Sequence, residues 1–238
     1  MLTCLAGCAS SHVPKPAPAK LEPWTFESHP GHIARTNHYA IHTTIEDDDL
    51  VQTLAIVMEA AHSKYQQFAP GSATSTAPLD CFVFSRRSEW ARFTEQNTGA
   101  DAALYLQINR GGYTVRDWFV AYFVGNEGTI AVAAHEGWHQ YVARNFRSRL
   151  PPFLEEGIAT MFESVRIVDG TPRWDLSPRS FRARKLYDAI QTDSIWPLPQ
   201  LVTMHAGEIV SLPPAKIEAF YAQSWAFAEF LWDADGGK

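Results

Sequence analysis

The residues with the clearest chemical potential in this 238-residue chain are His135, Glu136 and His139, which form the pattern His-Glu-x-x-His. Four residues advance an α-helix by about 400°, so two histidines at this spacing project from one helical face, one turn apart. Their ring nitrogens could therefore bind one metal ion together. Glu136 is turned about 100° from His135, which places it beside the metal as a base for a water molecule but not among the ligands. The spacing indicates a metal site, with zinc as the expected ion.

A zinc site of this kind needs a third protein ligand, and the segment that follows the histidines supplies carboxylates. Pro151 and Pro152 predict the start of a second helix, over about residues 153–165, because proline is tolerated in the first helical turn. An antiparallel helix pair would bring Glu155 and Glu156 back over the histidines. Spacing alone does not choose between these two carboxylates.

The two segments together resemble the gluzincin metallopeptidases, in which His-Glu-x-x-His is followed on the next helix by the pattern W-L-x-E-G-x-A-x-x-x-E. This chain reads FLEEGIATMFE from Phe153 to Glu163, with Phe153 in place of the usual tryptophan. The resemblance implies that Glu156 is the third metal ligand. Glu163 lies two turns further along the same helix face, where it could orient a ligating histidine; the alternative is a solvated carboxylate at the helix end.

A further candidate, Tyr221, comes from gluzincins of the aminopeptidase type, which carry on a later helix a tyrosine that donates a hydrogen bond to the oxyanion. The segment FYAQSWAF around Tyr221 looks like that helix, although Gln223 and Ser224 replace the usual Lys and Gly. The G-x-M-E-N strand motif of aminopeptidases is absent, which argues against that activity. Its nearest likeness is Gly111–Val115, a predicted edge strand that could hold an extended peptide through backbone hydrogen bonds.

Hydrophobic periodicity predicts the elements that must position these residues. An Ala-rich run leads without a break into His135 and predicts one buried helix over Thr129–Phe146, with Thr129 as its N-cap. Apolar residues at three- and four-residue spacing predict an amphipathic helix over about 50–68, with the acidic run 46–49 at its N-terminus. Strands are predicted at 37–44, 81–84, 112–115 and 119–124, and further helices at 88–96, 180–191 and 214–232.

The expected fold class is therefore α+β. The resemblance makes it zincin-like: a small mixed or antiparallel sheet packs on the active-site helix and is followed by a mainly helical C-terminal part. Residues 24–128 would form the N-terminal α/β part, and residues 129–238 the helical part that carries the zinc site. Within the first part, Pro30 and Gly31 predict a loop that contains His29 and His32.

The N-terminal segment has a different character. Leu5–Cys8 resembles the lipobox of bacterial lipoproteins, in which the leader is cut before the cysteine and that cysteine is lipidated. Residues 1–8 would then be a truncated leader, because they are too few to supply the charged and apolar regions of a signal peptide. Residues 9–23 are rich in Pro and Ala and predict an extended tether.

Composition limits the classes of partner. The chain is 46% hydrophobic and its formal net charge is −6, with no basic block to neutralise a phosphate backbone, so a nucleic-acid partner is not expected. No uncharged apolar stretch reaches the roughly 18 residues that a membrane-spanning helix requires. Contact with a membrane would come only through a lipid on Cys8.

From about Asn37 to the C-terminus, the chain is most similar to a group of predicted bacterial envelope proteins with a peptidase-MA-like domain. The resemblance implies an envelope-located, zinc-dependent endopeptidase that holds one Zn²⁺ and acts on a peptide or protein. It also implies further helices beyond Lys238. Two alternatives stay open: a non-catalytic envelope module that binds a peptide or cell-wall component, and a structural lipoprotein in which His135, His139 and Glu156 form a hydrogen-bonded core.

Overall fold

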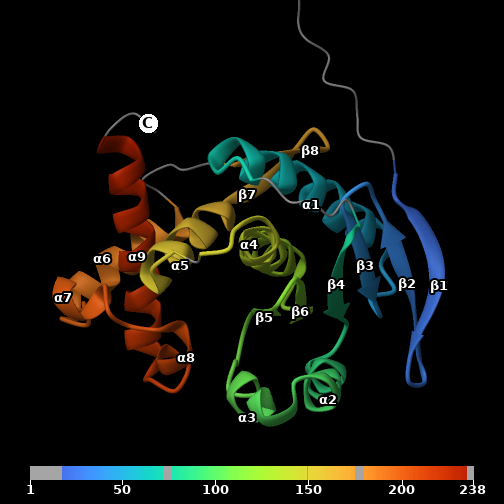
Figure 1. Ribbon diagram of the computed structural model, residues 1–238, viewed down its shortest axis with the longest axis horizontal. Helices are drawn as coiled ribbons and strands as arrows, with labels where there is room; N and C mark the ends of the chain where they lie inside the picture. Colours follow the sequence, from blue (N-terminus) through green and yellow to red (C-terminus); the bar gives the residue numbers. More distant parts are fainter. Residues whose placement is uncertain (1–17, 72–76, 149, 175–179, 235–238) are drawn as a thin grey trace, which may run out of the picture.

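A computed structural model describes residues 18–71, 77–148, 150–174 and 180–234 (Figure 1). The predicted leader, the lipobox with Cys8 and the first part of the predicted tether lie outside these residues. The described residues form an α+β structure with one mixed sheet, as predicted for the fold class. None of the described helices has the length and apolar character needed to cross a membrane.

A six-stranded sheet occupies the N-terminal half, in the order β1-β2-β3-β4-β6-β5. The pairs β3·β4 and β4·β6 are parallel, and the other three neighbouring pairs are antiparallel. Consequently β5 is an edge strand that runs against the direction of its only neighbour in this sheet. The strands are β1 (Lys20–Phe26), β2 (His29–Arg35), β3 (Tyr39–Thr43), β4 (Leu79–Phe84), β5 (Gly112–Val115) and β6 (Trp118–Tyr122).

Helices cover both faces of the sheet (Figure 1). Alternate residues of β4 show how the strands feed two cores: Cys81 and Val83 join the cluster under α1 (Asp48–Phe68) and α4 (Asn126–Asn145), whereas Phe84 joins the cluster around α2 (Arg87–Asn97). The acidic run caps α1 as predicted, because the Asp47 side chain accepts a hydrogen bond from the backbone N–H of Leu50. The 3₁₀ turn η1 and helix α3 connect α2 to β5 and span Gly99–Asp101 and Ala102–Tyr105.

The C-terminal part is mainly helical, and its last helix packs along two of the others. Helix α5 (Pro152–Phe162) packs against α4 and α9, and α9 (Pro214–Ala234) also packs against α6. A two-stranded hairpin separates α5 from α6. The remaining elements are β7 (Val165–Val168), β8 (Thr171–Trp174), α6 (Phe181–Gln191), α7 (Leu198–Leu201) and α8 (Ala206–Ile209).

The two helices that carry the predicted ligands differ from the prediction at one end each. Helix α4 begins at Asn126, so Thr129 is not the N-cap; it lies in the first turn, where its hydroxyl donates to the Gly125 carbonyl. Helix α5 ends at Phe162 and not near residue 165, because Val165 already pairs in the β7–β8 hairpin.

The first two strands were not predicted. Strand β1 starts at Lys20, inside the range 9–23 expected to be a tether, and β2 contains His29 and His32, which were expected in a loop. Gly31 allows β2 to pair closely with β3, since a Cβ on Gly31 would collide with the main-chain oxygen of Thr43 on β3. This glycine serves a close approach of two strands and not a turn.

Candidate metal centre

Helix α4 presents both histidines from one buried face, with less than a tenth of each residue exposed. The glycine between them has a packing role: a Cβ on Gly137 would lie 2.8 Å from the hydroxyl of Tyr65 and 2.9 Å from Cε of Met58, both on α1. Helix α1 therefore packs closely on the side of α4 that carries Gly137, and this contact fixes the helix that carries His135 and His139.

Helix α5 carries the two adjacent carboxylates, and a second glycine explains how it is held. A Cβ on Gly157 would collide with the main-chain oxygen of Ser224 on α9, so only glycine permits the observed approach of α9 to α5. Glu155 and Glu156 are both buried and point to different atoms of the histidine pair. The two adjacent carboxylates therefore make different contacts, a difference that spacing did not predict.

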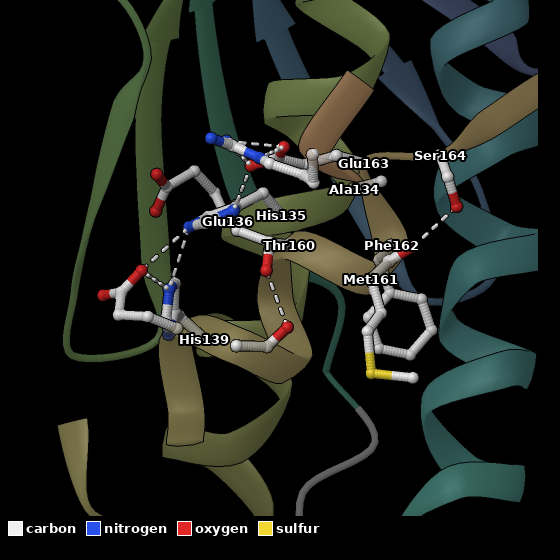
Figure 2. Close-up of polar contacts among 12 residues, drawn as sticks. Ala134, His135, Glu136, His139, Thr160, Met161, Phe162, Glu163 and Ser164 are labelled. Atoms are coloured by element: carbon white, nitrogen blue, oxygen red, sulfur yellow. Dashed lines mark hydrogen bonds and ion pairs between the residues drawn. The ribbon is translucent and has the colours of Figure 1, made fainter. Parts of the chain in front are cut away.

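Three side-chain atoms converge on one point between α4 and α5. Nε2 of His135 lies 3.2 Å from Nε2 of His139 and 3.2 Å from Oε2 of Glu156, and Nε2 of His139 lies 3.5 Å from the same carboxylate oxygen. Figure 2 shows the two histidine rings turned toward each other, one turn apart on α4. These three residues are the set in the described chain whose ligand atoms lie close enough to share one metal ion.

The Nδ1 atom of each histidine contacts a separate carboxylate. Nδ1 of His135 lies 2.8 Å from Glu163, and Nδ1 of His139 lies 3.1 Å from Glu155 (Figure 2 for Glu163). A carboxylate at Nδ1 accepts that N–H and leaves the lone pair of Nε2 free to bind a metal. Glu163 therefore has the orienting contact expected of it, and Glu155 makes the equivalent contact on the other ring.

The donor set is suited to a metal ion. Oε2 of Glu156 is buried and makes no well-aligned hydrogen bond with the described residues. With both Nδ1 atoms protonated, two ring nitrogens and a carboxylate oxygen face one another, and at most one proton can lie between the nitrogens. Two imidazoles and one carboxylate are a common ligand set for zinc at catalytic sites.

The pKa values of His135, His139 and Glu156 are all shifted by the charges of their neighbours. Burial alone lowers the pKa of His135 and His139, but hydrogen bonds and charge from Glu155, Glu156 and Glu163 outweigh burial and raise them to about 9 and about 10. Burial alone raises the pKa of Glu156, but the charge of His139 and the closeness of both imidazoles to the carboxylate bring it well below its usual range. The site therefore favours a cation, whether a metal ion or protons.

Glu136 follows His135 directly on α4, and its side chain contacts the sheet. The hydroxyl of Thr114 on β5 is 2.8 Å from Oε2 of Glu136 and 3.1 Å from the main-chain oxygen of Glu136, so it donates to either acceptor. Gly112, on the same side of β5, leaves room for the side chain, since a Cβ there would lie 3.1 Å from Cγ of Glu136. Burial raises the pKa of Glu136, and the neighbouring histidine charges and Thr114 oppose this rise.

Tyr221 reaches the centre from α9. Its ring centroid lies 6.2 Å from that of His135, and within the described residues its hydroxyl has no hydrogen-bond partner. Burial, followed by the negative charges of Glu156 and Glu136, raises the pKa of Tyr221 well above its usual value. The phenol is therefore a neutral hydrogen-bond donor near His135.

The structure brings together all six residues predicted for the site: His135, Glu136, His139, Glu156, Glu163 and Tyr221. It adds three contacts that the sequence pattern did not reveal, from Thr114, Glu155 and Arg182. Arg182 makes a bidentate pair with Glu163, and in the sequence it is one of several basic residues on an amphipathic helix, with nothing to distinguish it from a solvated one.

Comparison of the chain with protein-family models, curated proteins and solved structures gives no match. The chemical capacity of the centre follows from its own residues. Two imidazole nitrogens and a carboxylate can hold a metal ion, a separate buried carboxylate can take up a proton, and a neutral phenol can donate a hydrogen bond.

Proposed function

We propose that this protein is a zinc-dependent hydrolase of the gluzincin type that cleaves peptide bonds, built on a zincin-like fold. The observation that supports this most directly is the convergence of His135 Nε2, His139 Nε2 and Glu156 Oε2 within 3.5 Å, with each imidazole Nδ1 held by its own carboxylate. Two ring nitrogens that bind one metal ion must point toward the same place, whereas a hydrogen-bonded structural core does not require this arrangement.

In this proposal His135, His139 and Glu156 hold one zinc ion. Bound zinc supplies Lewis acidity, which makes a water molecule nucleophilic near neutral pH and polarises a carbonyl oxygen. Three protein ligands are the number found at catalytic zinc sites, which keep one further position for water or substrate.

Glu136 is the general base in this proposal. It is buried, it follows His135 directly on α4, and it is not one of the three converging donors. Its carboxylate acts first as a base, by taking a proton from the attacking water. It then acts as an acid, by passing that proton to the nitrogen of the leaving amine. Thr114 holds the carboxylate while these transfers occur.

Tyr221 donates its hydroxyl proton in a hydrogen bond to the oxygen that becomes negative as the carbonyl is attacked. The absence of a competing partner for this hydroxyl in the described part of the chain supports the role. Because the pKa of Tyr221 is raised, the phenol keeps its proton over the working pH range.

A peptide substrate is favoured by the edge strand. Strand β5 pairs on one side with β6 and lies beside α4, and in the described sheet its other edge has no partner strand. An extended peptide can add to such an edge through main-chain hydrogen bonds. It would then lie next to Glu136, which contacts Thr114 on this strand.

The proposed location is the bacterial envelope, with a lipid on Cys8 as the anchor. This part rests on the sequence around Cys8 alone. Incorporation of a labelled fatty acid into the wild-type protein, but not into Cys8→Ala, is the expected result when the full gene is expressed in a bacterium.

The test of the function combines zinc stoichiometry with cleavage of a mixed peptide library, with and without a chelator. We expect one zinc per chain and chelator-sensitive cleavage. Glu136→Gln should keep zinc and lose at least about 100-fold in rate, because a general base contributes about 10²–10⁴-fold. Unchanged cleavage by Glu136→Gln would refute the mechanism, whereas stoichiometric zinc without cleavage would favour a binding module.

A further inference from the structure

One buried cation lies behind the proposed metal ligands. The guanidinium of Arg182, near the start of α6, contacts groups from two other helical segments, and its side chain is only 15% exposed. Its Nε is 2.8 Å from Oε2 of Glu163 and its Nη2 is 2.8 Å from Oε1 of the same carboxylate. On α9 it lies 5.4 Å from the ring centroid of Tyr221 and 3.7 Å from Oε2 of Glu218.

The contact with Glu163 fixes a metal ligand indirectly. Oε1 of Glu163 is shared: it accepts from Nη2 of Arg182 and from Nδ1 of His135, each at 2.8 Å. A bidentate pair with arginine holds both carboxylate oxygens in one plane, so the carboxylate cannot rotate away from the imidazole. The orientation of the His135 ring therefore depends on a residue of α6.

The same guanidinium also lies near Tyr221. The centroid of the Tyr221 ring is 5.4 Å from the guanidinium carbon of Arg182 and 6.2 Å from the centroid of the His135 ring. Helix α6 holds the arginine firmly at its first turn, because the Ser180 side chain caps the helix by accepting from the N–H of Ala183. One side chain thus joins α5, α6 and α9 behind the metal ligands.

We propose that Arg182 is a positioning residue of the metal centre, through which the docking of α6 and the affinity for the metal ion depend on each other. The proposal rests on the zinc site of the proposed function. If docked α6 strengthens metal binding, then bound metal must stabilise docked α6 by the same free energy.

The test measures zinc affinity and not catalysis. The full chain is freed of metal, and zinc binding is followed by competition with a chromophoric chelator for the wild type, Arg182→Met, Arg182→Lys and Arg184→Met. Arg184 is an exposed arginine two residues further along α6, and Arg184→Met is the matched control. We expect Arg182→Met to weaken zinc binding about 10- to 100-fold, as for other residues that orient metal ligands. Arg182→Lys should recover part of the loss, because lysine keeps the charge but not the bidentate geometry.

Hydrogen exchange supplies a second measurement that also serves if Arg182→Met does not fold. In the wild type, zinc should slow amide exchange across Phe181–Gln191, and the slowing should be smaller in Arg182→Lys and unchanged in Arg184→Met. A merely structural arginine would lower stability without changing this response to zinc.

The outcomes separate the two proposals. Zinc affinity and exchange response in the Arg182 variants equal to those of Arg184→Met would overturn the role of Arg182 and leave the peptidase proposal in place. Zinc binding that depends on Arg182 without peptide cleavage would support Arg182 and refute the peptidase. A wild-type chain that binds no zinc would overturn both.

Discussion

The hydroxyl of Thr114 lies 2.8 Å from Oε2 of Glu136 and so ties the edge strand β5 to the residue that follows the first histidine of α4. The contact places the proposed base and the proposed substrate-binding strand in one unit. Movement of β5 would move the carboxylate with it.

Thr114→Val removes this hydroxyl while keeping the shape of the side chain. We expect kcat to fall about 10- to 100-fold, because a misplaced base loses proximity to its proton. Zinc affinity should stay unchanged, since the Thr114 hydroxyl hydrogen-bonds to Glu136, which is not one of the proposed metal ligands. Thr114→Ser keeps the hydroxyl and should retain most of the activity; equal losses in both variants would show that the hydrogen bond is not the cause.

Glutamine substitutions at the two adjacent carboxylates should separate ligand from support. Glu156→Gln removes a charged donor from the converging set and should abolish stoichiometric zinc at micromolar metal. Glu155→Gln removes the negative charge from the carboxylate at His139 Nδ1 and should weaken zinc binding about 10- to 100-fold. The reverse order of effects, measured by chelator competition, would make Glu155 the ligand.

Zinc binding should release protons. The pKa values of His135 and His139 are raised to about 9 and about 10 in the metal-free protein, so the site holds protons at pH 7 that zinc must displace. We expect about one to two protons per ion, so that zinc affinity rises with pH. Calorimetry in buffers of different ionisation enthalpy measures this number, and a value of zero would contradict the charge state of the site.

The metal-free protein should show the opposite pH dependence in its stability. The folded pKa values of the two histidines lie above the unfolded value of about 6.5, so their contribution is fully present below pH 6.5 and is lost as pH rises through about 9 and 10. Urea unfolding in the presence of a chelator should show this fall. His135→Gln removes one of the two groups and should flatten the curve.

Gly157→Ala tests the packing that sets the distance between α5 and α9. The added methyl group would collide with the main-chain oxygen of Ser224, and we expect a loss of about 1–3 kcal/mol in the free energy of unfolding. Gly207→Ala on α8 is the control, because its Cβ would make only an ordinary contact with Leu104. Similar unfolding free energies for the two variants would show that α9 can shift at little cost.

The ligand-bearing part of the site was predictable because its information is local. His135 and His139 depend on the period of one helix, and the next helix offers two adjacent carboxylates, of which only the resemblance to gluzincins selected Glu156. Thr114 and Arg182 are distant in sequence from the groups they contact, and only the packing of β5 against α4 and of α6 against α9 brings them there. Nothing in their neighbouring residues marks them.

The missed strands have a different cause. Pro23, Pro30 and Gly31 are residues that normally mark turns, yet here they lie inside β1 and β2. Gly31 is required by the close approach of Thr43 on β3, a tertiary contact that the local sequence does not reveal. The hairpin after α5 was missed because its two strands have only four residues each, with its turn at Asp169 and Gly170, both at positive φ.

The shared oxygen of Glu163 has a consequence for how such sites change over evolutionary time. The three converging donors lie within two consecutive helices and can persist as a recognisable motif, whereas the arginine that steadies one of them belongs to a third helix. If Arg182 acts as proposed, a descendant chain that loses it would still display the histidines and the glutamate while its affinity for metal declines. The residue at position 182 would then distinguish chains that still bind the metal ion from chains that keep the histidines and the glutamate but have lost metal affinity.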